Sequence, residues 1–175
     1  RLIKDYMPSD EDSAGYATEL EWVNLDHQGR GARHQLRSVH PVRVAAVQWK
    51  MRRVESFESF AKQVEFFVDT AADYKTDFLL FPELFTLQLL SLVEGGRPGE
   101  AARQLAEFTP QYLELFAEMA VKYAVNIIGG TQFEMVGDQL FNTAFFFRRD
   151  GTLDKQHKIH VTPSEARWWG VQGGD

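Results

Sequence analysis

The stretch DFLLFPELFT, residues 77–86, is the part of the chain that decides the fold. Its short apolar run, bounded by breakers, is typical of a buried β-strand. Pro82 cannot donate a hydrogen bond to a neighbouring strand, so we expect the strand to end there. Glu83 then follows the strand end among large apolar neighbours. A carboxylate in such a place is costly unless it is paired or used, so Glu83 is a candidate general base; the alternative is that it turns outward into solvent.

The composition is that of a soluble globular protein with one core of ordinary size. The chain has 175 residues, of which 44% are hydrophobic and 25% charged, and its net charge is -6. The negative charge argues against a nucleic acid or an anionic membrane as partner. No apolar run is long enough to span a bilayer, and no signal-peptide pattern is present. The absence of cysteine excludes disulfides, fits a cytoplasmic location, and leaves no cysteine nucleophile within these residues.

The first forty residues differ in composition from the rest, which predicts a domain boundary between residues 1–40 and 42–175. Residues 16–24 alternate as a strand would, with a short helix as the alternative. Residues 26–41 are rich in His, Gly and Arg, which predicts a solvated linker; a basic phosphate-binding patch is the less favoured alternative. The chain begins with an arginine and ends with Gly-Gly-Asp after a Trp-rich segment, so we expect a fragment of a longer protein.

Residues 42–81 predict a β-α-β unit. A β-branched strand over 42–49 precedes a helix over 56–74, whose apolar residues recur at i, i+3, i+4 and i+7, and the strand over 77–81 follows. This order implies a parallel pair of strands with a right-handed crossover.

After the β-α-β unit, residues 84–93 are apolar and should be buried. The Gly- and Pro-rich segment 94–99 should be a loop at the rim of a pocket. A second helix is expected from Thr109, and then a buried strand over 125–130. The double glycine that ends this strand would let backbone or ligand approach closely.

The last part of the chain predicts a hairpin. A strand over 139–147 and a return strand over 152–161 flank an Asp-Gly turn. On the return strand Lys158 and His160 would share one face and His157 the other. Because the two histidines then point apart, we expect no metal site. Beyond the hairpin, Trp168 and Trp169 could line a pocket, although packing is the simpler interpretation.

Four short motifs occur in a recognisable order: FPELF at 81–85, IIGG at 127–130, NTA at 142–144 and HKIH at 157–160. Together they resemble the nitrilase, or carbon–nitrogen hydrolase, superfamily, which splits non-peptide C–N bonds. The resemblance covers residues 42–175. It implies an α/β fold of the four-layer α-β-β-α sandwich type, of which this chain would hold the N-terminal part, and a Glu-Lys-Cys triad.

The resemblance also implies roles for individual residues. Glu83 matches the general base and Lys158 the lysine that stabilises the transition state. Glu165 matches a second, supporting glutamate of some members, although it would serve equally well as a helix-start residue. The nucleophilic cysteine would lie on a later strand, beyond residue 175, so the fragment alone should be inactive.

The function implied is an amidase-type hydrolase that works through a thioester, without a cofactor or a metal. Its substrate would be a small-molecule amide, carbamoyl compound or nitrile, and its assembly a homo-oligomer, a dimer or larger. One alternative is a catalytically silent binding or regulatory module with the same fold. Another is an unrelated α/β domain in which Glu83 and Lys158 are structural.

The beginning of the chain has a resemblance of its own. KDY at 4–6, DED at 10–12 and GYATELEW at 15–22 resemble the closing segment of a GNAT-type acetyltransferase domain. This resemblance implies an acyltransferase fused in front of the hydrolase, with its acetyl-CoA site upstream of residue 1. The silent module would then be a partner domain of that N-acetyltransferase.

Overall fold

The computed structural model describes residues 22–25, 31–34 and 41–175 and divides into two compact units, Arg1–Val42 and Arg43–Asp175. In the first unit, β1 (Trp22–Leu25) pairs with β2 (Gly31–His34) in an antiparallel sheet. Residues 31–34 of the predicted linker therefore form a strand, and the linker itself stays a prediction. Residues 16–21 of the predicted strand lie outside the described residues.

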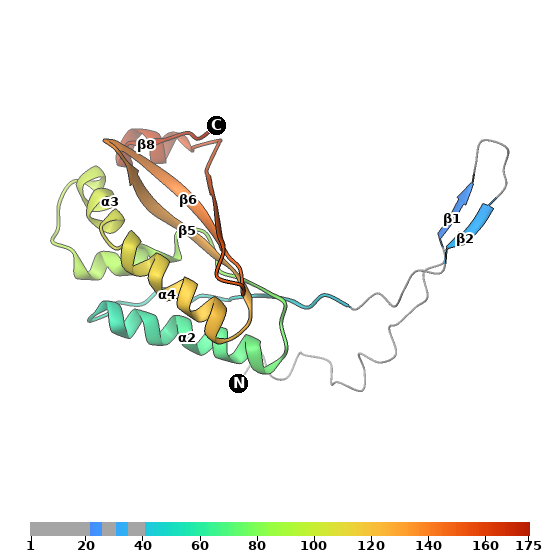
Figure 1. Cartoon of the computed structure of the whole chain (residues 1–175). Coiled ribbons are helices and arrows are strands. Elements are labelled where there is room, and N and C mark those ends of the chain that lie inside the picture. The colour runs from blue at the N-terminus through green and yellow to red at the C-terminus, as the bar shows by residue number, and fades with distance from the viewer. Residues whose placement is uncertain (1–21, 26–30, 35–40) are drawn as a thin grey trace. The chain divides into compact units, whose positions relative to one another are not determined.

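The second unit contains a six-stranded sheet (Figure 1). Its strands are β3 (Val44–Ala46), β4 (Phe78–Leu80), β5 (Asn126–Val136), β6 (Gln139–Phe147), β7 (Leu153–His157) and β8 (Val171–Gln172). The order is β3-β4-β5-β6-β7, with β8 paired to β6. The pairs β3–β4 and β4–β5 are parallel, whereas β5–β6 and β6–β7 are antiparallel. The predicted parallel pair and the predicted hairpin are therefore both confirmed.

The helix between the two parallel strands is α2 (Phe57–Asp73), which confirms the helix expected over 56–74. Ser56 caps it: its hydroxyl accepts a hydrogen bond from the Ser59 amide at 3.1 Å, and the Ser59 hydroxyl accepts one from the Ser56 amide at 3.2 Å. This reciprocal capping box satisfies two amides that the first turn would leave unpaired. The buried residues are Phe60, Val64, Val68 and Ala71, all from the predicted apolar stripe.

The segment after β4 is helical for most of its length. A 3-10 helix, η2 (Phe85–Leu92), is followed by α3 (Pro98–Ala106) and α4 (Thr109–Lys122). The loop expected over 94–99 gives way to α3 at Pro98, and the loop prediction overlooked this helix. Proline fits the first turn of a helix because the amide that it lacks has no partner there. Glu100 adds an acceptor for the Arg97 amide at 3.1 Å.

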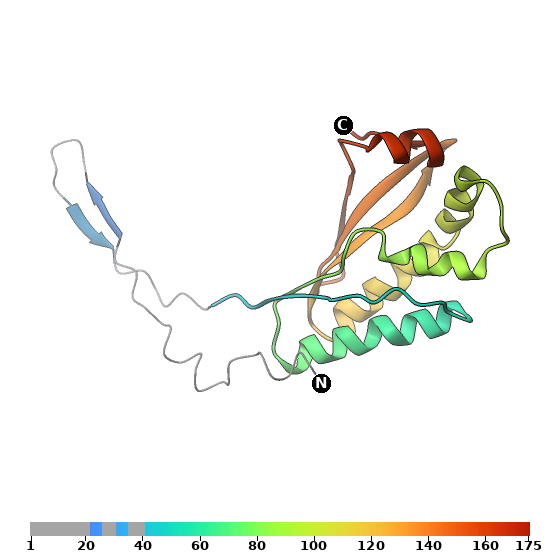
Figure 2. The same cartoon turned by 180° about the vertical axis from the view of Figure 1, so that it is seen from behind.

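The helices cover one face of the sheet. Figures 1 and 2 show α2 and α4 side by side below the strands. Leu79, Ile127 and Phe147, which are aligned across the sheet, are at most 2% exposed, and Phe147 stacks on Phe116 of α4. The next residues along these strands point to the opposite face, because side chains alternate along a strand. Residues 43–175 thus form an α/β unit with one helical layer and one sheet; the further two layers of the predicted sandwich stay a prediction.

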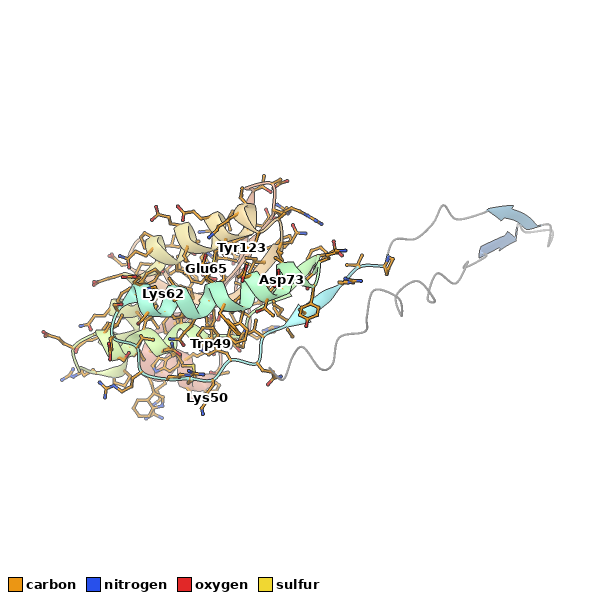
Figure 3. All side chains as sticks on the ribbon, turned by 90° about the horizontal axis from the view of Figure 1, so that it is seen from below. Trp49, Lys50, Lys62, Glu65, Asp73 and Tyr123 are labelled. Atoms are coloured by element: carbon orange, nitrogen blue, oxygen red, sulfur yellow. The ribbon has the colours of Figure 1, made fainter. Side chains whose placement is uncertain are left out.

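Two contacts fix α2 within the helical layer (Figure 3). On one side, Glu65 accepts hydrogen bonds from the Tyr123 hydroxyl at 2.8 Å and from the Lys122 ammonium at 2.7 Å, which tie α2 to the end of α4. On the other side, the Trp49 ring packs against Phe60 with 5.9 Å between centroids. No helix among the described residues has both the length and the apolar character needed to cross a bilayer.

Candidate active site

The turn that carries Glu83 is held in a strained conformation. Glu83 lies three residues beyond the end of β4 at Leu80, and Leu84 adopts the left-handed region with φ 49° and ψ 27°. This region is unfavourable for a leucine, and strained residues of this kind cluster at functional sites. The Leu84 amide donates a hydrogen bond to the Thr131 hydroxyl at 2.9 Å, which stabilises the turn against β5.

The double glycine on β5 allows this turn to lie close to the strand. A Cβ atom on Gly130 would be 2.2 Å from the Pro82 carbonyl oxygen, and the φ of Gly130 is +67°. A Cβ atom on Gly129 would be 2.2 Å from the Tyr112 hydroxyl, which donates to the Gly129 carbonyl at 2.7 Å. The pairing of β5 with β6 is irregular at this point. The prediction that these glycines permit close approach is confirmed.

Lys158 approaches Glu83 from the edge of the sheet that β7 forms. It lies directly after β7, which ends at His157, so the expectation that the return strand continues to residue 161 is wrong. The backbone of Lys158 is still fixed, because its amide donates to the Asn142 carbonyl at 2.8 Å and its carbonyl accepts from Gly174 at 2.9 Å. His157 instead contacts the Thr143 hydroxyl at 2.9 Å. Among the described residues no three His, Asp or Glu side chains are grouped to hold a metal ion.

The Lys158 ammonium brings the three predicted site residues together. Its Nζ lies 2.8 Å from Glu83 Oε1, and 3.1 and 2.9 Å from Glu165 Oε1 and Oε2. Burial alone would lower the pKa of Lys158, but its hydrogen bonds to Glu83 and Glu165 outweigh burial and raise that pKa. The lysine therefore carries its charge at neutral pH, so it can stabilise negative charge but cannot accept a proton.

Glu165 is the buried carboxylate of the cluster. Its side chain is 7% exposed. Besides Lys158, the Thr162 amide and hydroxyl donate to its Oε2 at 3.0 and 2.8 Å. Burial alone would raise the pKa of Glu165, but the hydrogen bonds from Lys158 and Thr162 lower it to about 2. A group that is ionised at every pH above about 2 is a poor general base at neutral pH and a good permanent counter-charge.

Glu165 lies at a helix start, as the second interpretation of this residue expects. Glu165 is the first residue of the short helix η3 (Glu165–Trp169). Its amide donates to the Thr162 hydroxyl at 3.3 Å while its carboxylate accepts from the Thr162 amide, which is the exchange of a capping box. The Thr-x-x-Glu spacing in the sequence could have predicted this pair.

Glu83 has a different environment from Glu165 and is the more exposed of the two carboxylates. Its side chain is 53% exposed rather than buried among apolar neighbours. Its Oε1 accepts from Lys158 and, at 2.9 Å, from the Asn142 amide nitrogen. Its Oε2 has no hydrogen-bond partner among the described residues. Glu83 is thus turned toward solvent and paired at the same time, with one oxygen free to accept a proton.

Asn142 is the member of the cluster to which the sequence interpretation gave no role. It lies on β6 with no exposed surface, and its Nδ2 donates to Glu83 Oε1 and to Glu165 Oε1, each at 2.9 Å. A buried asparagine in a largely apolar strand is the signal that could have indicated it.

The cluster is not in the 650 Å³ cavity of the unit, whose lining includes Glu94 and Phe108 but no member of the cluster. Of the two tryptophans, Trp169 packs edge-on against Phe133 with 5.3 Å between centroids. Trp168 is 57% exposed. Packing is therefore the role of Trp169, as the simpler interpretation has it.

Comparisons with known proteins identify the family and the fold. Over all 175 residues the chain is 45% identical to the probable hydrolase YhcX of Bacillus subtilis strain 168, but it spans only 34% of the length of that curated relative. The fold is similar to that of a carbon–nitrogen hydrolase from Helicobacter pylori G27, with a TM-score of 0.62 and 19% identity over 77% of this chain and 45% of the other. An amidase from Nesterenkonia sp. gives a TM-score of 0.61 and 18% identity over 77% of this chain and 48% of the other.

A second fold likeness comes from Saccharomyces cerevisiae Nit3, a nitrilase-superfamily member, with a TM-score of 0.60 and 21% identity over 77% of this chain and 49% of the other. At such identities the likeness shows the fold alone. The family itself is shown by residues 43–172, which match the carbon–nitrogen hydrolase family over most of the chain. The unrelated α/β alternative is thereby excluded, and the chain belongs to the carbon–nitrogen hydrolase family.

Proposed function

We propose that this chain supplies the base and the lysine of an amidase-type hydrolase that cleaves the C–N bond of a small amide, carbamoyl compound or nitrile. The observation that carries the proposal is the 2.8 Å contact between Lys158 Nζ and Glu83 Oε1, with the second Glu83 oxygen unpartnered among the described residues. Support for an amide comes from the Nesterenkonia amidase, a variant of which was solved in complex with butyramide.

The proposed reaction gives different roles to the carboxylates of Glu83 and Glu165. Glu83 Oε2 takes the proton from a cysteine thiol, whose sulfur attacks the carbonyl carbon. The charged Lys158 stabilises the oxyanion that develops on the carbonyl oxygen. The departing amine takes the proton from Glu83 and leaves a thioester. Glu83 then takes a proton from water as the water attacks the thioester carbon, and it gives this proton to the departing sulfur, which releases the acid and restores the thiol.

Glu165 takes no part in these proton transfers in our proposal. With a pKa of about 2 it stays ionised, and its two bonds to Nζ hold the ammonium in place from the buried side. Two titratable groups of the same type in different environments commonly have such different roles.

The nucleophile must come from the longer protein, because the chain contains no cysteine. We propose that it lies on a strand after residue 175. The first test is to read the encoding gene past Asp175. A cysteine at the end of the next apolar strand would support the hydrolase, whereas a serine or alanine there would favour the catalytically silent binding or regulatory module.

The second test is kinetic and uses the longer protein with a small amide substrate. Glu83→Gln removes the base and should lower kcat by about 100-fold or more. Lys158→Ala removes the oxyanion charge and should lower it by about 100- to 1,000-fold. Lys155→Ala is the matched control, because Lys155 forms a similar 2.6 Å pair with Glu134 outside the cluster. Full turnover in either of the first two variants would refute the assignment.

Three further predictions belong to the longer protein. The acetyltransferase-like segment of residues 4–22 falls almost entirely outside the described residues, so the fusion and its acetyl-CoA site stay a prediction. Binding of acetyl-CoA to the longer protein, measured by calorimetry, would test it. A homo-oligomeric assembly and a cytoplasmic location are likewise predictions.

A further inference from the structure

We propose that Asn142 is a positioning residue that decides which oxygen of Glu83 acts as the base. The inference rests on the proposed function above and adds a residue to which that function gave no role. Asn142 lies on β6, between the two carboxylates, and no part of it is exposed.

The side-chain amide of Asn142 has two N–H groups in one fixed plane, and both are used. One points to Glu83 Oε1 and the other to Glu165 Oε1, each at 2.9 Å. A single neutral group therefore sets the spacing of the two carboxylates around the ammonium. A carboxylate at this position would repel both neighbours, and a cation would compete with Lys158 for them.

The backbone of Asn142 contributes as well. Its carbonyl accepts the Lys158 amide at 2.8 Å. The same residue thus fixes the lysine through its main chain and the base through its side chain. Because both contacts start from one buried strand residue, the distance between Glu83 and Lys158 is set by a rigid element rather than by two loops.

The oxygen of the Asn142 side chain does not account for an amide at this position. Asn142 Oδ1 is buried and has no hydrogen-bond partner among the described residues. An unpaired buried acceptor costs about 1–3 kcal/mol, so this oxygen does not explain the choice of residue. The two donors do, because they are the atoms that contact the carboxylates.

Positioning by Asn142 has a chemical consequence for Glu83. With Lys158 and Asn142 both donating to Oε1, only Oε2 is left to take a proton. The half-exposed Glu83 side chain would otherwise rotate about its last torsion, because a terminal carboxylate torsion is broad. The Asn142 donor therefore selects one orientation of the base.

The test uses Asn142→Leu, which removes both donors and keeps a side chain of similar size, and Asn142→Ser, which keeps one hydroxyl donor. The matched control is Gln132→Leu. Gln132 is also fully buried and also has an unpaired oxygen, but it donates to the Leu105 carbonyl and not to the cluster. A loss of stability common to buried amides would appear equally in the control.

In the longer protein, with a small amide substrate, Asn142→Leu should lower kcat by about 100-fold with KM changed less than about threefold, because the base is misplaced while substrate binding is kept. Asn142→Ser should recover part of the loss, and Gln132→Leu should keep the wild-type kcat. Wild-type kcat in Asn142→Leu, or an equal loss in the control, would overturn the inference.

A structural measurement on residues 1–175 separates this inference from the proposed function. In crystals of Asn142→Leu we expect Glu83 to leave its 2.8 Å contact with Lys158, whereas the control should keep it. An unchanged Glu83 position would overturn the positioning role whatever the kinetics. If Glu83 moves as expected but the wild-type longer protein hydrolyses no amide, the positioning role stands and the hydrolase proposal fails.

Discussion

The low pKa of Glu165 makes a quantitative prediction about stability. Replacing the carboxylate in Glu165→Gln removes the charge that Lys158 and Thr162 stabilise but keeps the size of the side chain. A group whose pKa is lower in the folded than in the unfolded state stabilises the fold above its unfolded pKa and loses this effect as pH falls through its folded pKa. For Glu165 the window therefore extends from about 4.5 down to about 2.

The size of this stabilisation follows from the pKa of Glu165 in the unfolded and in the folded state. A pKa that falls from 4.5 to about 2 corresponds to about 3 kcal/mol of stabilisation at neutral pH. Integration of the linkage relation gives a loss of about 2 kcal/mol of this between pH 6 and pH 3. The stability difference between wild type and Glu165→Gln should therefore shrink by about 2 kcal/mol over that range.

The assay is urea unfolding of residues 1–175 at half-unit intervals from pH 3 to pH 7, followed by tryptophan fluorescence. Comparing each variant with wild type at the same pH removes the contribution of the other carboxylates. Glu58→Gln is the control, because Glu58 is exposed and pairs only with Lys62 at 2.7 Å on the surface of α2. Exposed pairs of this kind contribute little, so the control should show no resolvable pH dependence.

One result would refute the reasoning. If the difference between wild type and Glu165→Gln is constant from pH 3 to pH 7, the carboxylate is not held ionised by its donors, and the counter-charge role fails with it. A change in the urea m-value would instead show that the variant alters the unfolded state, so only midpoints at constant m count.

Two smaller changes test the scaffold of the site. Gly130→Ala places a Cβ atom 2.2 Å from the Pro82 carbonyl at a φ of +67°, so it should cost more than about 2 kcal/mol in urea unfolding and displace Glu83; wild-type stability would contradict the close approach. Ser56→Ala removes the cap of α2 and should cost about 1 kcal/mol while amide turnover in the longer protein is unchanged; a loss of turnover would show that α2 affects the site.

The sequence predicts the parallel core of the unit well, because two strong periodicities are present there. The stripe of apolar residues at helical spacing predicts α2, and the breakers at each end of residues 77–81 predict β4. In contrast, the helix α3 was not predicted. It is only nine residues long, and the proline at its start, in a Gly-rich segment, is equally typical of a loop. The strand β2 was not predicted because residues 26–41 are rich in His, Gly and Arg, a composition typical of a linker.

The site is only partly predictable from local pattern. The meeting of Glu83 and Lys158, 75 positions apart, was expected from the resemblance to a family and not from spacing. The apolar pattern left open whether Glu83 is buried or turns outward, although its neighbours Phe81 and Phe85 are buried, at 1% and 2% exposed. The residue that follows Glu83, Leu84, is in the left-handed region, which no apolar pattern encodes.

The outer face of the sheet connects the fold prediction with the chemical one. Leu80, Ile128 and Phe146 are aligned on the face away from the helices, and Leu80 is 40% exposed. Covering a row of such residues is favourable, at roughly 25 cal/mol per Å² of apolar surface removed from water. Leu80 precedes Glu83 by only three residues, so a second sheet on this face would also bring new side chains near the base. Any apolar segment could cover this face of the sheet. The proposed reaction also needs a segment that places a thiol next to Glu83 Oε2, and the hydrolase proposal depends on this second condition.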